Sequence, residues 1–595
     1  MGQGQYSKAE SSFLKSLKVY QVLNIESHPH SVKTMHRLAI LYLKKGLFNQ
    51  ALLMKSRAIK IYNAWIRTEA ISYSVGNRLI INNSFRSIPG IRDDSTYFIP
   101  MSTEFEFNSR LNRKAILLEI EQKQLILARQ QSTNMMLLDQ LKDLIEKSAS
   151  PFIEKDNFKN LQEEKEKIET DLYQRLPTFE ISELSSKEIA SVISSNGVLI
   201  EYFKYQSMLK SSKKSILWSQ PHYMATLLKS NGTISSISLG KSSVIDDSIA
   251  RALKATSENL KDSSILWRNV SNQLLGPLKK HLSYETKILI VPDSELNRIP
   301  FAALPSPLNW AEPFGITNQL QVLNSSRELL RNNNKLMASS SPVVMANPNF
   351  YNSNSYDSAN TKQKSNGTTL TNKARIWDPL PNSSQEGKEI ADILGVPLIQ
   401  GDDASTSRLK EVSSPKIIHI ASHGLFGSRA VSQKLYKTSL FLSKFYGDGI
   451  FNDKLDPMFL GSIVLAGANN LDGTGYITAA EIAGLNLGGT ELVVLSTCDS
   501  GDGYIQTGEG IYGLQRALAI AGARTTLLSL WKVDDSATKA FMIRFYTLLK
   551  EGKNRSNALI ETQREFRNHP NRIWQDPYYW AGWQLVGDWQ PIKGL

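Results

Sequence analysis

The chain has 595 residues, of which 41% are hydrophobic and 21% are charged. This composition is that of a globular protein and excludes a wholly disordered, collagenous or membrane-embedded chain. The length predicts about two to four domains. The formal net charge of +13 is compatible with the binding of nucleic acid, an acidic partner or an anionic membrane surface. It is also compatible with a large protein whose surface is mildly basic.

The number of cysteines and the N-terminal sequence exclude further classes of protein. The single cysteine, Cys498, excludes an intrachain disulfide, a Cys-rich zinc site and a CxxC redox motif. No stretch approaches the roughly 18 consecutive apolar residues of a membrane-spanning helix, and the N-terminus lacks the apolar core of a secretory signal. The myristoylation pattern requires Ser or Thr where this chain has Tyr6. We therefore expect a soluble, cytoplasmic protein.

The first residues contain a repeat with a period of 42 residues. Gly4 and Ala9 recur at the same spacing as Gly46 and Ala51, and an apolar helical pattern follows each pair. Each period predicts two helices joined by a turn at the glycine, and the small alanines allow close helix packing. The pattern resembles the tetratricopeptide repeat in its longer form. About one and a half repeats are visible, so we expect a truncated array over residues 1–66.

Two helical stretches follow the repeat. Residues 108–148 are rich in Leu, Ile, Gln and Lys, and residues 156–175 form a very polar helical pattern. They predict either a stalk that relays partner binding or plain helical packing against the next domain. We assign residues 67–185 to this helical connecting region.

From about Ser191 onward, strands and helices alternate. This alternation predicts an α/β fold, with a mainly parallel, doubly wound sheet covered by helices on both faces. The predicted strands are residues 198–203, 215–220, 223–228, 287–292, 343–346, 416–420, 491–495 and 525–530. The predicted helices are residues 245–280, 386–395, 407–411, 478–483, 510–522 and 537–551.

The α/β part divides into an N-terminal half, residues 186–345, and a second half, residues 379–595. The intervening residues 346–378 include an Asn/Ser/Thr/Lys-rich stretch, 351–375, that has no apolar period. This stretch predicts a mobile loop, which is either an ordinary insertion or a gate or processing site.

His423 and Cys498 each follow directly after a predicted buried strand, and a glycine follows each of them closely. Functional groups of parallel α/β sheets collect at the carboxyl ends of the strands, and glycine lets the backbone approach a ligand. A thiolate is a strong nucleophile, and a nearby imidazole can take its proton. If the two strands are neighbours, the pair predicts a cysteine–histidine dyad. Otherwise Cys498 is a small buried hydrophobe and His423 an ordinary polar group.

Other chemistries have less support. His419 alternates along the strand that precedes His423 and is expected to point into the sheet. A zinc site built from these two histidines lacks a helix and a third ligand, so no metal is expected. The sequence has no phosphate-binding Gly-x-x-x-x-Gly-Lys-Ser/Thr motif, and Gly501 and Gly503 do not complete a dinucleotide fingerprint, so no cofactor is expected.

A series of phrases extends over roughly two thirds of the chain, from about Leu199 to Trp589. They are VPDSELNRIPFAAL (291–304), PLP (379–381) with Glu386, HIASHG (419–424), LA (465–466), LSTCDSG (495–501), GEG (508–510), SLWKVDD (529–535), PYYWA (577–581) and GDW (587–589). In this order they resemble the CHAT domain, a caspase-like peptidase domain found with tetratricopeptide repeats. Clostripain, gingipain, caspase and separase are more distantly similar.

The resemblance implies a cysteine endopeptidase. Cys498 would attack the scissile carbonyl, and His423 would be the general base or acid. The backbone N–H groups of Gly424 and Cys498 would form the oxyanion hole, in which one donor is typically worth about 3–4 kcal/mol. In this clan the two side chains can act across bound substrate, so they need not be within hydrogen-bond reach without it. The sequence identifies no third member of a triad.

Acidic residues near the dyad are candidates for the P1 pocket, which holds the substrate residue before the cleaved bond. A buried acid there would pair with Arg or Lys. Asp534 and Asp535 follow a predicted strand, and Asp499, Asp502 and Glu509 are rivals near the nucleophile. On this assignment, Asp535→Ala lowers cleavage after basic residues much more than it lowers stability. The alternative is that Asp535 caps the helix beginning near residue 536 or 537.

The resemblance also implies a regulated cysteine endopeptidase that cleaves a protein substrate. It further implies that the repeat region senses a protein or ribonucleoprotein partner, as in effectors of bacterial antiviral defence. We expect no membrane partner and no direct sequence-specific binding of nucleic acid. The alternative is a catalytically silent scaffold of repeats plus CHAT domain, against which the intact His423 and Cys498 count.

Overall fold

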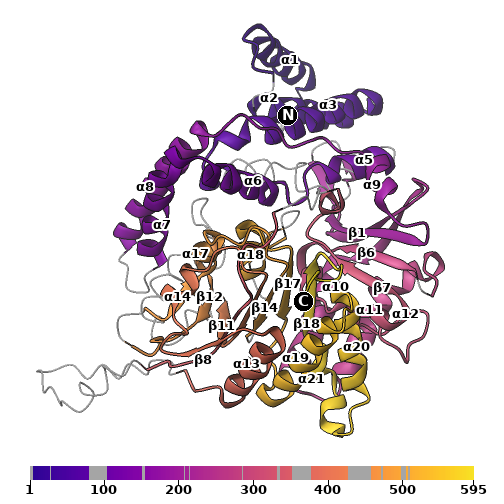
Figure 1. Cartoon of the computed structure of the whole chain (residues 1–595). Helices are drawn as coiled ribbons and strands as arrows, with labels where there is room; N and C mark the ends of the chain where they lie inside the picture. The colour runs from indigo at the N-terminus through magenta and orange to yellow at the C-terminus, as the bar shows by residue number, and fades with distance from the viewer. Residues whose placement is uncertain are drawn as a thin grey trace, which may run out of the picture.

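The computed structural model describes residues 5–26, 29–79, 103–149, 155–206, 208–212, 215–284, 286–330, 336–351, 377–426, 457–470, 474–497, 504–506 and 510–595. In Figure 1 the N-terminal helices lie along one side of a larger α/β part. None of the helices in these ranges combines the length and apolar content needed to span a bilayer.

The first three helices form the predicted repeat: α1 (Tyr6–Val22), α2 (Pro29–Lys44) and α3 (Phe48–Thr68). Gly46 has φ of 73°, a left-handed conformation that glycine adopts without strain, and it forms the predicted turn between α2 and α3. Ala51 is fully buried in the apolar cluster that joins these helices. The small alanine therefore does allow the close packing expected of the repeat.

The connecting region contains more helices than the two predicted ones, because the first predicted stretch is divided. They are α5 (Thr103–Leu111), α6 (Ile116–Gln130), α7 (Met135–Ala149) and α8 (Lys155–Arg175). The predicted helix over residues 108–148 is interrupted at Ala115, which has φ of 53°. The interruption lets buried Lys114 donate from Nζ to the carbonyl oxygens of Tyr202 (3.2 Å) and Pro292 (2.7 Å), an anchoring that the helical pattern does not reveal.

In the described residues, the α/β part is built on a sheet of 11 strands in the order β5-β4-β1-β6-β7-β18-β17-β14-β10-β8-β9. Its strands are β1 (Gly197–Tyr205), β4 (His222–Lys229), β5 (Ile234–Lys241), β6 (Lys287–Val291), β7 (Gln319–Val322), β8 (Val343–Pro348), β9 (Leu398–Gly401), β10 (Ile417–Ala421), β14 (Leu492–Ser496), β17 (Thr525–Ser529) and β18 (Trp583–Gly587). The smaller strands are β2 (Met208–Ser212), β3 (Ser215–Trp218), β11 (His423–Phe426), β12 (Gly461–Val464), β13 (Tyr476–Thr478), β15 (Tyr504–Gln506) and β16 (Gly510–Tyr512).

The sheet is mainly parallel, as expected, but it also contains antiparallel pairings that the sequence did not indicate. Strand β18 pairs antiparallel with β17 and parallel with β7, so the two halves of the sheet run in opposite directions. At one edge, β4 and β5 add two antiparallel pairings. The α/β class with an N-terminal helical region is confirmed. The position of β18 depends on contacts with β7 and β17 that local sequence patterns do not encode.

Helices cover both faces of the sheet. One face carries α10 (Ser242–Ser257), α11 (Ser263–Leu274), α13 (Pro381–Leu394), α19 (Asp535–Lys550) and α20 (Arg555–Arg567), and the other α17 (Ala479–Ala483), α18 (Leu514–Ala521) and α6. Because neighbouring strand residues point to opposite faces, Ile417 packs in the first core and Ile418 in the second. Shorter helices in the described part of the chain are α9 (Ser186–Val192), α12 (Phe314–Thr317), α14 (Thr406–Lys410) and α21 (Pro577–Trp580).

Two predicted helices differ from those observed. The stretch over residues 245–280 is two helices, α10 and α11, followed by a 3₁₀ turn. The helix expected over residues 510–522 begins only at Leu514, because residues 510–512 pair as strand β16 with β15.

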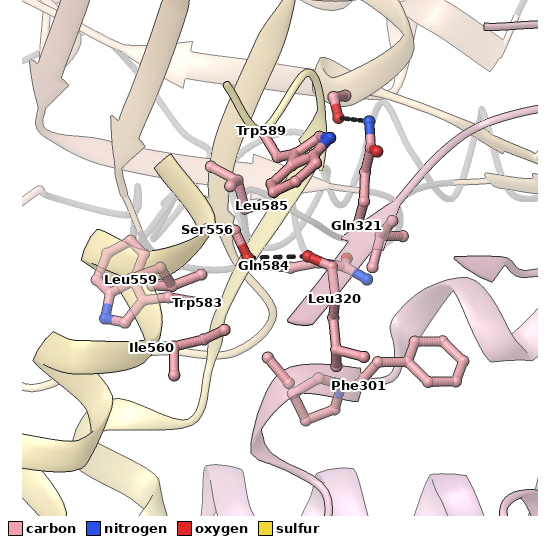
Figure 2. A pocket seen from close by; sticks show the side chains of 14 residues that line it. Phe301, Leu320, Gln321, Ser556, Leu559, Ile560, Trp583, Gln584, Leu585 and Trp589 are labelled. Carbon is pink, nitrogen blue, oxygen red and sulfur yellow. Dashed lines mark hydrogen bonds between the residues drawn. The ribbon is translucent and has the colours of Figure 1, made fainter. Parts of the chain in front are cut away.

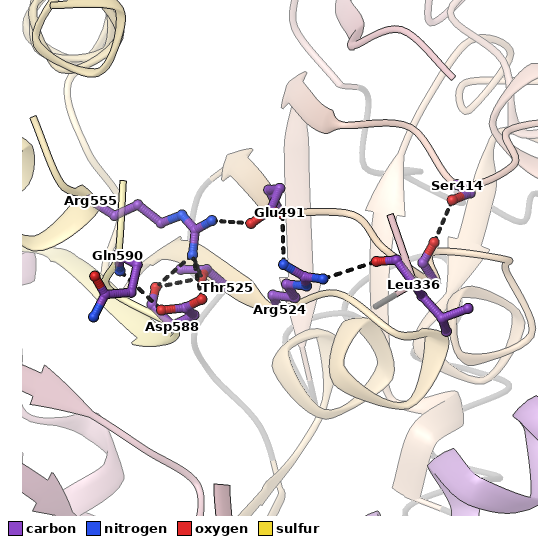
Figure 3. A network of polar contacts seen from close by, with 9 residues as sticks. Leu336, Ser414, Glu491, Arg524, Thr525, Arg555, Asp588 and Gln590 are labelled. Atoms are coloured by element: carbon purple, nitrogen blue, oxygen red, sulfur yellow. Dashed lines mark hydrogen bonds and ion pairs between the residues drawn. The ribbon is translucent and has the colours of Figure 1, made fainter. Parts of the chain in front are cut away.

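A polar network joins the amino ends of β14 and β17 to the end of β18 (Figure 3). The fully buried guanidinium of Arg555 contacts Glu491 and donates to Thr525 Oγ1 (3.0 Å) and to the carbonyl oxygen of Asp588 (3.1 Å). Glu491 also accepts from Arg524 Nη1 at 2.7 Å. The charges are paired, as buried charges must be. The network therefore fixes the amino ends of β14 and β17. The carboxyl ends of these strands lie at the opposite end of the sheet.

Candidate active site

The histidine and cysteine motifs follow two neighbouring parallel strands. Strand β10 pairs with β14, and Ala421 is the register partner of Ser496. His423 lies two residues after Ala421, and Cys498 lies two residues after Ser496. Cys498 itself is outside the described residues. The residue before it, Thr497, is buried, and its carbonyl oxygen accepts a hydrogen bond from the hydroxyl of Ser529 on β17.

His423 begins a strand that leaves the main sheet. It is the first residue of β11, which joins β12 and β13 in a separate three-stranded sheet. Its half-buried ring contacts two aromatic rings, with centroid distances of 4.9 Å to Trp377 and 5.3 Å to Phe350. These rings restrict the imidazole to a narrow range of orientations.

The backbone also fixes which nitrogen of His423 carries the proton. Nε2 lies 2.8 Å from the carbonyl oxygen of Asp378. A carbonyl only accepts hydrogen bonds, so Nε2 is the donor, and the neutral ring then has its acceptor at Nδ1. Sequence reasoning missed Phe350, Trp377 and this carbonyl. The sequence feature that could have pointed to these groups is the Pro-Leu-Pro phrase, which begins directly after Asp378.

His419 lies in a different environment from His423. It is fully buried and faces α13 and α19, as predicted for a side chain that points into the sheet. Its Nε2 is 3.1 Å from Glu386 Oε1, and its Nδ1 is 3.3 Å from the hydroxyl of Tyr546. Burial, and then the nearby Glu386 carboxylate, raises the pKa of Tyr546 well above its usual range. The tyrosine therefore stays protonated, and its hydroxyl shares a hydrogen bond with His419 Nδ1.

The acidic P1-pocket candidates that are described have structural partners. Asp534, not Asp535, is the N-cap of α19, and its Oδ1 accepts from the backbone N–H of Ala537 at 2.9 Å. The expected cap is therefore displaced by one residue, because the helix already begins at Asp535. Asp535 Oδ2 accepts from the backbone N–H (2.9 Å) and from Nδ2 (3.0 Å) of Asn382. Its assignment to a P1 pocket stays a prediction.

The remaining candidates are only partly described. Gly424 is buried in β11 opposite Ile463 of β12. Its proposed partner in the oxyanion hole, Cys498, and the rivals Asp499, Asp502 and Glu509 lie outside the described residues. So does the loop stretch 352–376. Among the described residues, no cluster of three or more His, Cys, Asp or Glu side chains could hold a metal ion.

His423 lines neither of the two cavities described next. The one in Figure 2, where β7 and β18 meet α20, has a volume of about 30 Å³ and is lined by Phe301, Leu320 and Trp583 among others. It has room for about one or two water molecules but not for a substrate. A groove of about 750 Å³ lies where β10, β14 and β17 begin and is lined by Arg129, Arg524 and their neighbours.

Helix α6 of the connecting region contacts the half of the α/β part that carries His423. Its Gln122 Nε2 donates to the carbonyl oxygen of Ala519 at 2.6 Å, and its Glu121 pairs with buried Arg516 at 2.9 Å. Both partners belong to α18, the helix that follows the β15–β16 hairpin downstream of Cys498. Arg129, also on α6, donates to the carbonyl oxygens of Gly484 (2.8 Å) and Leu485 (2.7 Å).

Comparisons with known proteins give two curated relatives. Human tetratricopeptide repeat protein 28 is 26% identical over 334 residues, which are 52% of this chain and 12% of the human protein. The mouse protein of the same name is 27% identical over 226 residues, covering 36% of this chain and 9% of its own length. The matched stretches thus span only about a tenth of these relatives.

Two solved structures share a distant likeness. Gingipain R, an Arg-specific cysteine proteinase, has a TM-score of 0.31 at 10% identity over 59% of this chain and 75% of its own. The separase–securin complex of Saccharomyces cerevisiae has a TM-score of 0.43 at 8% identity over 97% of this chain and 44% of its own. Likeness at this level carries no argument about function.

Family profiles match the two parts of the chain separately. The profile of the CHAT domain matches residues 264–588, more than half of the chain. The tetratricopeptide repeat profile matches residues 1–64, where α1, α2 and α3 lie. The chain is therefore a member of the CHAT-domain family with tetratricopeptide repeats at its N-terminal side.

Proposed function

We propose that this protein is a cysteine endopeptidase in which Cys498 is the nucleophile and His423 the general base and acid. One observation carries the proposal. The motif that contains His423 follows a strand in parallel register with the strand that leads to Cys498. The hydrogen bond from His423 Nε2 to Asp378 adds a defined acceptor at Nδ1, which a general base needs.

The proposed reaction has two steps. The thiol proton of Cys498 passes to His423 Nδ1 as the sulfur attacks the scissile carbonyl carbon, and the imidazolium then protonates the departing amine. His423 next takes a proton from water, whose oxygen attacks the thioester and releases the carboxylic acid and the thiol. The N–H groups of Gly424 and Cys498 are the proposed donors to the oxyanion in each step.

We also propose that the repeat region binds a protein partner that regulates cleavage. The support is physical continuity, because one apolar cluster includes Trp65 of α3, Ile116 of α6 and Leu518 of α18. A change in the packing of the repeats therefore has a direct route to the helix downstream of the cysteine. The division into repeat region, connecting helices and two α/β halves is part of this proposal. An antiviral-defence effector is the setting that the resemblance implies, and the neighbouring genes would test it.

Alkylation of the single thiol tests the chemistry without knowledge of the substrate. Iodoacetamide modifies Cys498 alone, so the loss of free thiol near pH 7 reports on that residue directly. The proposal predicts fast alkylation in the wild type and slow alkylation in His423→Ala, while the melting midpoints agree. Slow alkylation in both proteins would identify Cys498 as a buried structural residue and contradict the dyad.

A further inference from the structure

A short segment, Trp377–Pro381, carries two of the groups that hold His423. The indole of Trp377 lies against the imidazole, and the carbonyl oxygen of Asp378 accepts the hydrogen bond from Nε2. We call this segment the strap. Pro379 and Pro381 fix two of its φ angles and favour extended backbone at the residues before them. The strap is therefore stiff, and the position of its two ends decides where the Asp378 carbonyl lies.

Asn469 holds the first end of the strap. This residue follows β12, the strand that pairs with β11, where His423 lies. Its Oδ1 accepts from the backbone N–H of Trp377 at 2.8 Å, and its Nδ2 donates to the carbonyl oxygen of Trp377 at 3.1 Å. This two-point pairing fixes the orientation of the amide. The backbone N–H of Asn469 also donates to the carbonyl oxygen of Phe350 at 2.8 Å, so Asn469 holds both residues whose rings contact His423.

Asp535 holds the other end. Asn382 is the second residue of α13 and immediately follows the strap. Its backbone N–H is one of the first four of the helix, which have no partner within it. Asp535 of α19 supplies the acceptor at 2.9 Å and binds the Asn382 side chain at 3.0 Å. A carboxylate is also favoured at this helix end by the helix dipole.

We propose that Asn469 and Asp535 are positioning residues for His423, acting through the strap; this inference rests on the proposed function. Asn469 extends from the small sheet that contains His423, and Asp535 from the helix after β17, the strand paired with β14. Together they hold the two ends of the strap and so set the position of the Asp378 carbonyl that orients the imidazole. A positioning role for Asp535 affects the rate of cleavage after every kind of P1 residue. An acid in the P1 pocket would affect only cleavage after basic residues.

Matched substitutions separate these roles. Asp535→Ala removes the acceptor for Asn382, while Asp535→Asn keeps one carbonyl acceptor and loses the charge. Asn469→Ala removes both contacts to Trp377, while Asn469→Asp keeps the acceptor but places a carboxylate oxygen against the Trp377 carbonyl. Asn554→Ala is the control, because it removes a helix-start hydrogen bond of α20, 2.7 Å from Oδ1 to the N–H of Asn557, away from the strap.

The first readout is the iodoacetamide rate at Cys498, with His423→Ala as the reference for complete loss. We expect Asp535→Ala and both Asn469 variants to lose most of the alkylation rate that His423→Ala loses. The rates are compared at temperatures well below the melting midpoints of all variants. Asp535→Asn and the control should stay within about twofold of the wild type, the size of effect expected for uncoupled sites. The second readout is cleavage of peptides that differ only at P1, for which kcat should fall by one common factor with KM unchanged.

The outcomes distinguish the possible failures. If His423→Ala is slow but the Ala variants at positions 469 and 535 react like the wild type, the positioning role is overturned and the dyad stands. If Asp535→Asn loses cleavage after Arg and Lys only, Asp535 is a P1-pocket acid and its positioning role is overturned. If the wild type and His423→Ala react alike, the dyad fails, and the role assigned to the strap fails with it.

Discussion

Ala421 and Ser496 are partners in the parallel register of β10 and β14, and each lies two residues before a residue of the proposed dyad. Both strands are buried along their whole length, so their register is strongly determined. A shift of one residue would turn the His419 face of β10 towards the opposite core. The pairing that builds the sheet therefore also aligns the two motifs.

The contact of His419 with Glu386 gives the first prediction, on stability. Glu386→Ala removes the carboxylate whose Oε1 lies 3.1 Å from buried His419 Nε2, so breaking this buried polar contact should cost about 1–3 kcal/mol in the free energy of unfolding. Glu386→Gln keeps a polar oxygen at this position and should lose less. Tyr546→Phe removes one neutral hydrogen bond, worth about 1 kcal/mol. Chemical denaturation measures all three, and equal stabilities of the Ala and Gln variants would contradict the pairing.

Lys55 in α3 gives a prediction about pH. Burial lowers its pKa to about 7, an effect that Glu106 opposes and Arg113 increases. Below pH 7 both the folded and unfolded states carry the charge, and the folded state bears the full cost of burying it. Between pH 7 and the ordinary lysine value of about 10.4, the unfolded state binds more protons, so stability rises with pH.

The measurement compares the wild type with Lys55→Met, which keeps the length of the side chain and removes the charge. The melting midpoint of the wild type should rise relative to that of the variant between pH 7 and pH 10. A difference that stays constant over this range would show that Lys55 does not lose its proton there.

The contact between α6 and α18 predicts an energetic coupling. Glu121 and buried Arg516 are 2.9 Å apart, so removal of either partner takes away an opposite charge from the other. A double-mutant cycle with Glu121→Gln and Arg516→Met should give a coupling energy of about 0.5–3 kcal/mol. Additive effects would mean that this pair does not link the connecting helices to the CHAT domain.

Much of the fold follows from local patterns. The predicted strands near β6, β10, β14 and β17 were apolar runs of the right length, and Gly46 marked its turn correctly. The central place of β18 was not predictable, because its pattern does not reveal which strands it joins. The break at Ala115 was missed for a similar reason. It is stabilised by the contacts of Lys114 with residues about 90 and 180 positions away.

The candidate site shows the same limit. His423 could be proposed because chemistry-bearing residues at strand ends are a local signal. The groups that hold His423 could not be predicted in this way. Asp378 acts through its backbone carbonyl, which has no sequence signature. Asp535 was singled out as an acid near the site, but its contact with Asn382 depends on the packing of α13 against α19.

Proteolysis is the most direct test of the central claim. The wild type, Cys498→Ala and His423→Ala would each digest a diverse peptide library, first alone and then with candidate partners added one at a time. We predict cleavage by the wild type, with or without a partner, that is lost in both variants. Cleavage that persists in Cys498→Ala would contradict the account. So would the absence of cleavage under every condition together with a slowly alkylated Cys498.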